Sequence, residues 1–286
     1  MTRFQPAERR LAFWQATAAL LLLGACAARP VPPPLQERAN QFNEDGRKAY
    51  LRGDRDAAVR AFELALAAAQ SGDDADGIAM SRLNLARVEQ ARGNEGAAYR
   101  QLDALLDSSA VPAMPPKWRA EAAARKALLL VDAGKDASAL LDNAQAWCSN
   151  ECPAAAMIAN LRARVAADAG DHERALAVAA VALAAAQKAG SAAEEANALR
   201  TSGRARLAKG EAAMAAIAFA QALEADKREG RPERIYADLM LLGETALRLS
   251  QRPQATDFFR RAEQVAKAEG MNEQVAMARK RADESR

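Results

Sequence analysis

Few residues of this chain could carry chemistry, and two cysteines are the most suggestive of them. Cys148 and Cys152 lie in the segment WCSNECP, between two apolar helical stretches. In an oxidising compartment such an even pair predicts a disulfide, which would close a tight loop and hold the turn between two helical units. Free thiols, half of a metal site and a redox pair are the alternatives that the spacing leaves open.

Other catalytic groups have little support in the sequence. The only histidine, His172, follows Gly170 and Asp171 in an expected turn, so no second histidine could serve as a base or complete a metal site. Carboxylates are scattered along helix faces, as caps and solvated surface. No glycine-rich loop leads into a phosphate-binding lysine. We therefore expect a protein that is not an enzyme and that holds no metal or cofactor.

Composition favours packed helices as the elements that position these residues. Hydrophobic types make up 50% of the 286 residues, but aromatic types only 5%. Much of the apolar share is alanine, which is the best helix former and lets helices approach closely. No run of useful length alternates between apolar and polar residues as a strand would.

The charge balance bears on the choice of partner. The formal charge is +3 at pH 7, and Arg3, Arg9 and Arg10 against Glu8 give residues 1–25 a charge of +2. The remaining chain therefore carries +3 − 2 = +1. Binding to nucleic acid needs a strongly basic face. We therefore expect no nucleic-acid partner.

Two apolar helical stripes flank a short break at Gly53 in the segment NQFNEDGRKAYLRGDRDAAVRAFELAL, residues 40–66. Comparable breaks at positions 53, 93, 134, 170, 210 and 250 give spacings of 40, 41, 36, 40 and 40 residues. The pattern predicts six helical hairpins and a final helix. The expected helices are Gln36–Arg52, Asp54–Gln70, Ala75–Arg92, Glu95–Leu106, Lys117–Ala133, Asp136–Trp147, Pro153–Ala169, His172–Ala189, Ala192–Lys209, Glu211–Arg228, Pro232–Leu249, Pro253–Glu269 and Asn272–Ala282. Ser191 and Glu194 predict a reciprocal capping box.

Small residues recur at fixed distances from these breaks. In the first helices they are Gly46, Ala86, Ala127, Ala163, Gly203 and Gly243, and in the second helices Ala58, Ala98, Ala139, Ala175, Ala215 and Ala255. Four residues after the second set come Phe62, Leu102, Phe219 and Phe259, but Asn143 and Ala179 in the middle units. The middle units are therefore the most degenerate, and the proline-rich loop Ser108–Pro116 precedes them.

This pattern resembles the tetratricopeptide repeat, although the usual period of that repeat is about 34 residues. The resemblance implies an all-α fold, a right-handed superhelical solenoid of about six helical hairpins. It covers residues 36–270, and residues 271–286 would form a capping helix and tail that shield the last apolar face.

The first 25 residues have the form of a secretory signal peptide, with a basic start and the apolar run Leu11–Leu23. The ending Leu23-Gly24-Ala25-Cys26 resembles the bacterial lipobox, which implies cleavage before Cys26 and lipidation of its thiol. Ala27, rather than aspartate, points to the outer membrane. The proline-rich residues 26–35 read as a linker. An uncleaved membrane anchor is the alternative reading.

The resemblance also implies a binding groove lined by the first helix of each unit, with arginine holding a carboxylate and asparagine holding a peptide backbone. The residues that follow the small position, and others at helical offsets from them, are the candidates. They are Asn43, Arg47, Asn84, Arg87, Arg125, Asn160, Arg164, Arg200 and Arg204.

These features together predict a lipid-anchored scaffold of the cell envelope that faces the periplasm. It would bind protein partners in an envelope assembly or secretion process, through acidic or C-terminal peptide segments. A module that binds cell-wall glycan or regulates a cell-wall enzyme is the alternative, and it predicts exposed aromatic platforms around Trp118 and Trp147. An envelope enzyme with an unrecognised site would instead show a deep pocket with convergent ionisable groups.

Overall fold

The computed structural model describes residues 34–148 and 152–286, and every regular element in these ranges is a helix. The helices are α2 (Pro34–Leu51), α3 (Arg55–Ser71), α4 (Ala75–Ala91), α5 (Glu95–Leu106), α6 (Pro116–Asp132), α7 (Ser138–Trp147), α8 (Ala155–Asp168), α9 (His172–Ala189), α10 (Ala192–Ala208), α11 (Ala212–Glu229), α12 (Pro232–Arg248), α13 (Arg252–Ala268) and α14 (Asn272–Glu284). All thirteen expected helices are present, and their bounds differ from the prediction by no more than two residues.

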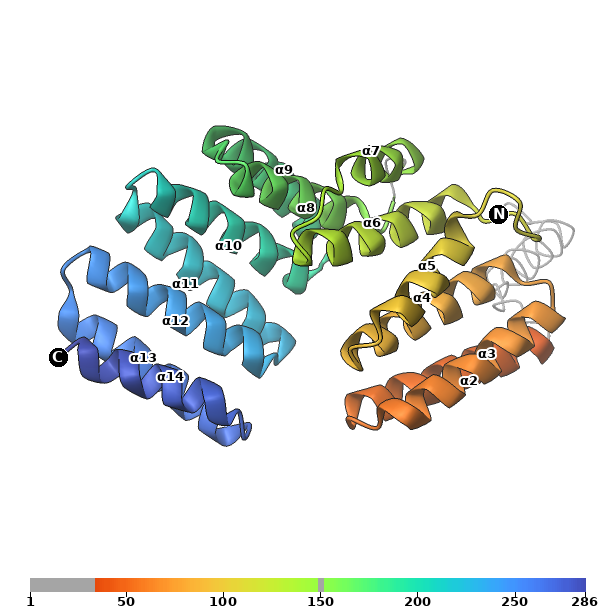
Figure 1. Ribbon diagram of the computed structural model, residues 1–286, viewed down its shortest axis with the longest axis horizontal. Coiled ribbons are helices and arrows are strands. Elements are labelled where there is room, and N and C mark those ends of the chain that lie inside the picture. Colours follow the sequence, from red (N-terminus) through yellow and green to blue (C-terminus); the bar gives the residue numbers. More distant parts are fainter. Residues whose placement is uncertain (1–33, 149–151) are drawn as a thin grey trace, which may run out of the picture.

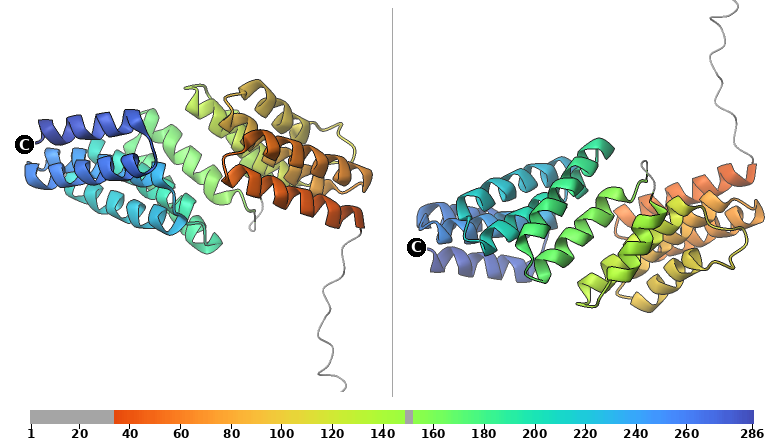
Figure 2. Two further views of the ribbon diagram at one scale, coloured as in Figure 1. Left: turned by 90° about the horizontal axis from the view of Figure 1, so that it is seen from below. Right: turned by 90° about the horizontal axis from the view of Figure 1, so that it is seen from above.

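The helices pack as six successive antiparallel pairs with α14 against the last pair, which makes an all-α solenoid of the tetratricopeptide type. The pairs follow one another around an arch, with α2 at one end and α14 at the other (Figures 1 and 2). The first helices α2, α4, α6, α8 and α10 also contact one another in series. The most extensive contacts between units join the second helix of one unit to the first helix of the next, as in α3 with α4 and α9 with α10. The additional contacts among the first helices place these helices on the inside of the curve.

The turns inside each hairpin explain where the helices stop. Gly53, Gly93, Gly134, Gly170 and Gly210 have φ values between 67° and 82°, and Ser250 takes the same left-handed conformation at 60° in the sixth unit. Glycine adopts this conformation without steric penalty, whereas a residue with a Cβ is strained there. The sixth turn therefore keeps its geometry although serine stands at the position of glycine.

Side-chain caps begin several of the helices. The carboxylates of Asp54, Asp74 and Asp171 each accept a backbone N–H three residues further on, and the hydroxyl of Ser191 accepts from the N–H of Glu194. The predicted capping box is only half right. The N–H of Ser191 already donates to the carbonyl of Ala186, and the Glu194 carboxylate instead accepts from the side chain of Asn160.

Glycine and phenylalanine occur together inside three of the hairpins. A Cβ on Gly46 would lie 2.6 Å from the ring of Phe62, and one on Gly203 would lie 2.5 Å from the ring of Phe219. Gly243 and Phe259 have the same relationship. The second unit, by contrast, pairs Ala86 with Leu102. Glycine is therefore required where the buried ring lies flat against the backbone of the first helix.

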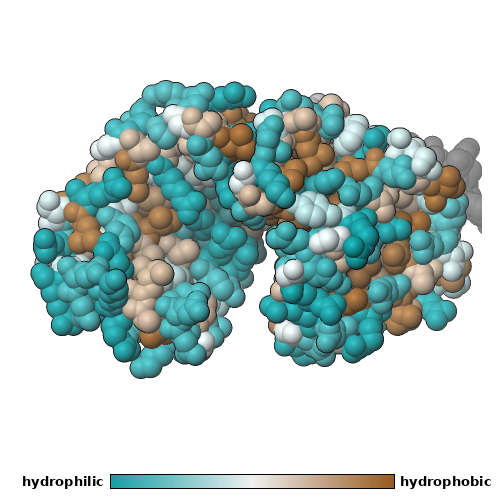
Figure 3. Space-filling model, in the orientation of Figure 1, coloured by the Kyte–Doolittle hydropathy of each residue, from teal (hydrophilic) through white to brown (hydrophobic). Residues whose placement is uncertain are grey.

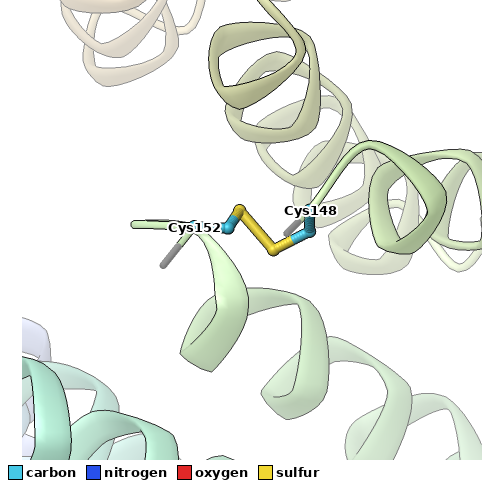
Figure 4. The surroundings of a disulfide bond; sticks show 2 residues. All are labelled: Cys148 and Cys152. Atoms are coloured by element: carbon cyan, nitrogen blue, oxygen red, sulfur yellow. A yellow bond between two sulfur atoms is a disulfide. The ribbon is translucent and has the colours of Figure 1, made fainter. Parts of the chain in front are cut away.

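The degenerate middle of the array contains a covalent link. A disulfide joins Cys148, at the end of α7, to Cys152, just before α8, with the two Cα atoms 5.1 Å apart (Figure 4). Cys152 is buried beside Ala154 and Ile158 in a cluster that also includes residues of α6 and α7. Closing so short a loop removes chain entropy from the unfolded state, which corresponds to a stabilisation of about 2 kcal/mol in the chain-entropy account.

The predicted signal peptide, Cys26 and nearly all of the predicted linker lie outside the described residues. Within residues 34–148 and 152–286, no helix combines the length and hydropathy needed to cross a membrane.

Candidate functional site

The arginines predicted to line the groove fall into two groups. Those of the N-terminal half already have local partners: Arg47 pairs with Glu44 at 2.7 Å, and Arg125 pairs with Glu121 at 2.7 Å. The guanidinium of Arg87 lies over the ring of Tyr50, 4.7 Å from its centroid. The hydrogen bond from Arg47 holds the pKa of Glu44 below its ordinary value. Arg47 and Arg125 are therefore paired with carboxylates of their own helices, whereas Arg87 has only the face of a neutral ring as its partner.

The asparagines predicted for the groove bridge neighbouring units instead. The amide of Asn43 donates to the hydroxyl of Ser81 (3.1 Å) on α4, and Asn84 donates back to the Asn43 carbonyl oxygen (3.1 Å). Asn43 is buried, and so is Asn160, whose amide donates to the backbone carbonyl (2.9 Å) and the carboxylate (2.6 Å) of Glu194 on α10. The groove prediction is wrong for Asn43 and Asn160, because the following unit covers both side chains.

Arg200 is the largest departure from the predicted groove. Only 5% of its surface is exposed, and its guanidinium lies between two fully buried carboxylates, Asp226 on α11 and Asp238 on α12. Its second terminal nitrogen donates to the side-chain oxygen of Asn197 at 2.6 Å. Arg200 therefore holds α10, α11 and α12 together, and the prediction that it faces a ligand is wrong.

Of the remaining candidates, Arg164 is partly buried and Arg204 is exposed. Arg164 on α8 pairs with Asp132 on α6 at 2.6 Å, so it links two units and is partly neutralised. Arg204 on α10 makes no ion pair with any described residue. Partial burial, followed by the charges of Arg200 and Arg164, lowers the pKa of Arg204. An arginine held beside other arginines has a charge available for an outside anion.

Arg234 on α12 is a second such arginine, and the sequence reasoning missed it. It is exposed, forms no ion pair within the described ranges, and has a pKa lowered first by partial burial and then by Arg200 and Arg231. No repeat signal marks this position, because the equivalent residue 40 positions earlier is Glu194. Both Arg204 and Arg234 are exposed to solvent. The partial burial that lowers their pKa values is therefore that of a recessed surface and not of a closed interior.

In the sixth unit, a glutamate occupies the position at which the fifth unit has Arg204. Glu244 on α12 is the residue equivalent to Arg204, and it accepts two hydrogen bonds from Arg281 of α14, at 2.6 Å and 2.5 Å. These bonds raise the pKa of Arg281 above its ordinary value. Among the residues that follow the small position of each first helix, Glu244 is the one acidic residue, and α14 neutralises it. The arginines at this repeat position therefore end with Arg204 on α10.

A hollow opens between the N-terminal units on one side and the C-terminal units on the other, and mostly hydrophilic residues border it (Figure 3). Neither described tryptophan is fully exposed, and each has a cation over its ring: Lys117 lies over Trp118 and Arg119 lies over Trp147, 5.0 Å and 4.0 Å from the ring centroids. Within the described ranges, no three His, Cys, Asp or Glu side chains are placed to hold a metal ion. The expectations that the chain is not an enzyme and holds no cofactor stay predictions.

The architecture defines a fold class, the tetratricopeptide-like helical solenoids. No protein-family model matches the chain, and no curated protein matches it. Solved structures do. A signal transduction ATPase with numerous domains and a tetratricopeptide repeat sensor, from Pyrococcus horikoshii, is 16% identical with a TM-score of 0.60, over 86% of this chain and 36% of that one.

A second similar structure is BtubC (BKLC) from P. vanneervenii. It is 17% identical with a TM-score of 0.52, over 84% of this chain and 93% of that one. The chain thus spans little more than a third of the Pyrococcus protein and most of the length of BtubC. At these identities the likeness establishes the fold alone.

Proposed function

We propose that this protein is a lipid-anchored scaffold of the cell envelope that binds partner proteins on the inner face of its arch. It acts at the outer membrane, facing the periplasm, in the assembly or secretion of other envelope components. The partner contributes an acidic or C-terminal peptide segment. The observation that carries the proposal is the pair Arg204 and Arg234, two exposed cationic side chains on the neighbouring first helices α10 and α12 that form no ion pair within the described ranges.

A peptide segment suits this surface better than a small anion does. Arg164, Arg204 and Arg234 stand on α8, α10 and α12, so the charges extend across three successive units rather than converging on one point. An extended acidic segment can meet such a row with several carboxylates, and a guanidinium can hold each one through two hydrogen bonds. Charge complementarity of this kind speeds association and selects among partners.

Crosslinking in intact cells, followed by mass spectrometry of the captured proteins, tests the proposal. Arg204→Ser with Arg234→Ser should lose most of the partner crosslinks made by the wild-type chain. The matched control is Arg60→Ser with Arg260→Ser, which removes the same charge from exposed positions on the second helices α3 and α13. The control should retain the crosslinks. Equal capture by both double variants would contradict the proposal.

The lipid anchor has a separate test. Cys26→Ser removes the thiol that the lipobox resemblance designates for lipidation, so the protein should move from the membrane fraction to the soluble periplasmic fraction. Metabolic labelling with a radioactive fatty acid should mark the wild-type chain and not the variant. Label on the Cys26→Ser chain, or unchanged fractionation, would remove this part of the proposal while leaving the peptide-binding part standing.

A further inference from the structure

The buried group around Arg200 contains more acidic than basic side chains. Asp226 and Asp238 have no exposed surface, and a single guanidinium nitrogen of Arg200 contacts both carboxylates. The distances from this nitrogen to the two Asp238 oxygens are 3.2 Å and 3.3 Å. Among the described residues, Arg200 alone forms an ion pair with these two carboxylates. With both ionised, one buried positive charge would face two buried negative charges, an imbalance that proteins relieve by taking up a proton.

An unpartnered oxygen indicates where that proton goes. Oδ1 of Asp226 is buried and accepts no hydrogen bond from the described residues. Because one nitrogen of Arg200 contacts oxygens of both residues, the carboxyl groups of Asp226 and Asp238 are neighbours around it. A proton on Asp238 would supply the donor that the Asp226 carboxylate lacks, and it would leave one negative charge to pair with Arg200.

We propose that Asp226 and Asp238 share one proton, and that its release loosens the packing of α10, α11 and α12. The C-terminal half of the solenoid is thereby a pH-responsive unit. The pair bridges units, because Asp226 lies near the end of the second helix of the fifth hairpin and Asp238 lies in the first helix of the sixth. This device is independent of which partner the arch binds.

The charged groups around the pair set its behaviour. Burial raises the pKa of Asp238, the charge of Arg200 opposes that change, and the hydrogen bond and charge of Asp226 add to it, so that the value reaches about 7. The other charged groups that interact with the two carboxylates from the surrounding elements, directly or through one another, are Arg204 on α10, Arg231 before α12 and Arg234 on α12.

The direction in which stability changes with pH follows from the pKa of Asp238 in the folded chain and in the unfolded chain. The pKa of Asp238 is raised on folding from an ordinary value of 3.8. Between these two values the folded chain binds more protons than the unfolded chain, so stability falls as pH rises. One proton corresponds to at most about a tenfold increase in the unfolding equilibrium constant for each pH unit in this window. Above pH 7 the stability that the bound proton contributes is fully lost.

Denaturant unfolding of the full chain between pH 4.5 and pH 8 provides the test. Asp238→Asn keeps a neutral donor in place of the protonated carboxyl, so its unfolding midpoint should vary less with pH than that of the wild type. Asp257→Asn makes the same chemical change at an exposed position on α13, and should follow the wild-type profile. Equal pH profiles for the wild type and Asp238→Asn would overturn the proposal.

A second measurement needs no variant to fold. Carbon NMR of the side-chain carboxyl groups in the wild-type chain should show one aspartate that titrates near neutral pH, far above the others. Hydrogen exchange, corrected for the intrinsic pH dependence of amide exchange, should show faster exchange of residues 192–248 at pH 8 than at pH 6, relative to residues 34–71. If every aspartate titrates in the ordinary acidic range, the shared proton does not exist.

Discussion

Replacing Gly203 by alanine should destabilise the protein by about 1–3 kcal/mol, although alanine is the better helix former. The added Cβ would lie 2.5 Å from the ring of Phe219, which is fully buried and has no free space into which to retreat. Overpacking of this kind forces the backbone or the ring from its favoured position. Urea unfolding of the variant and the wild type, followed by circular dichroism, measures the difference.

The chain itself supplies the compensating change. The second unit pairs Ala86 with Leu102 at the equivalent positions, so Gly203→Ala combined with Phe219→Leu rebuilds a pair that already packs elsewhere in this array. The double variant should be more stable than the sum of the two single changes predicts, with a coupling of about 0.5–3 kcal/mol. Additive effects would show that the ring and the glycine backbone do not constrain each other.

The matched control for this cycle is Ala86→Gly. It places glycine opposite Leu102, where no ring needs the space, so only the helix propensity of alanine is lost, about 1 kcal/mol. Glycine should therefore stabilise the fifth unit and destabilise the second. If Gly203→Ala instead stabilised the protein, as the higher helix propensity of alanine alone predicts, the packing account would be wrong.

Loss of Arg200 should have a still larger effect, about 3–5 kcal/mol for Arg200→Met. Methionine fills much of the same volume, but it leaves Asp226 and Asp238 buried together with no positive charge between them. Thermal and denaturant unfolding measure the loss. The greater part should be recovered when Asp226→Asn and Asp238→Asn are added, because no charge then remains buried.

Arg47→Met provides the comparison on the surface. Arg47 forms an exposed ion pair with Glu44 within one helix, and such pairs contribute little because water screens them. This variant should show no measurable change in stability. If Arg200→Met and Arg47→Met changed the free energy of unfolding by the same amount, the buried cluster around Arg200 would not be what holds α10, α11 and α12 together.

The sequence alone was sufficient to predict the helices and their pairing. Glycine at five of the tight turns, aspartate and serine at the caps, and the small residues of each hairpin are local signals that act within one or two helical turns. For this reason even the degenerate middle units have their helices in the expected places, and Cys148 lies close enough to Cys152 for the disulfide that the spacing predicts.

The candidate groove was only partly predictable. Asn43, Asn160 and Arg200 lie four residues before Arg47, Arg164 and Arg204. Residues at this spacing share one face of a helix, so the sequence cannot separate the two sets. The following unit separates them, because it packs over the earlier position and leaves the later one exposed.

What the sequence determined by itself is a series of helical hairpins with repeating positions. The tertiary structure alone decided which of those positions became interior. Asp226 and Asp238 lie 26 and 38 residues from Arg200, and nothing in the repeat marks them as its partners. Stacking of the units brings them together and removes their water. The physical reason is that burial is a property of neighbouring units, whereas sequence periodicity reports only on a single helix.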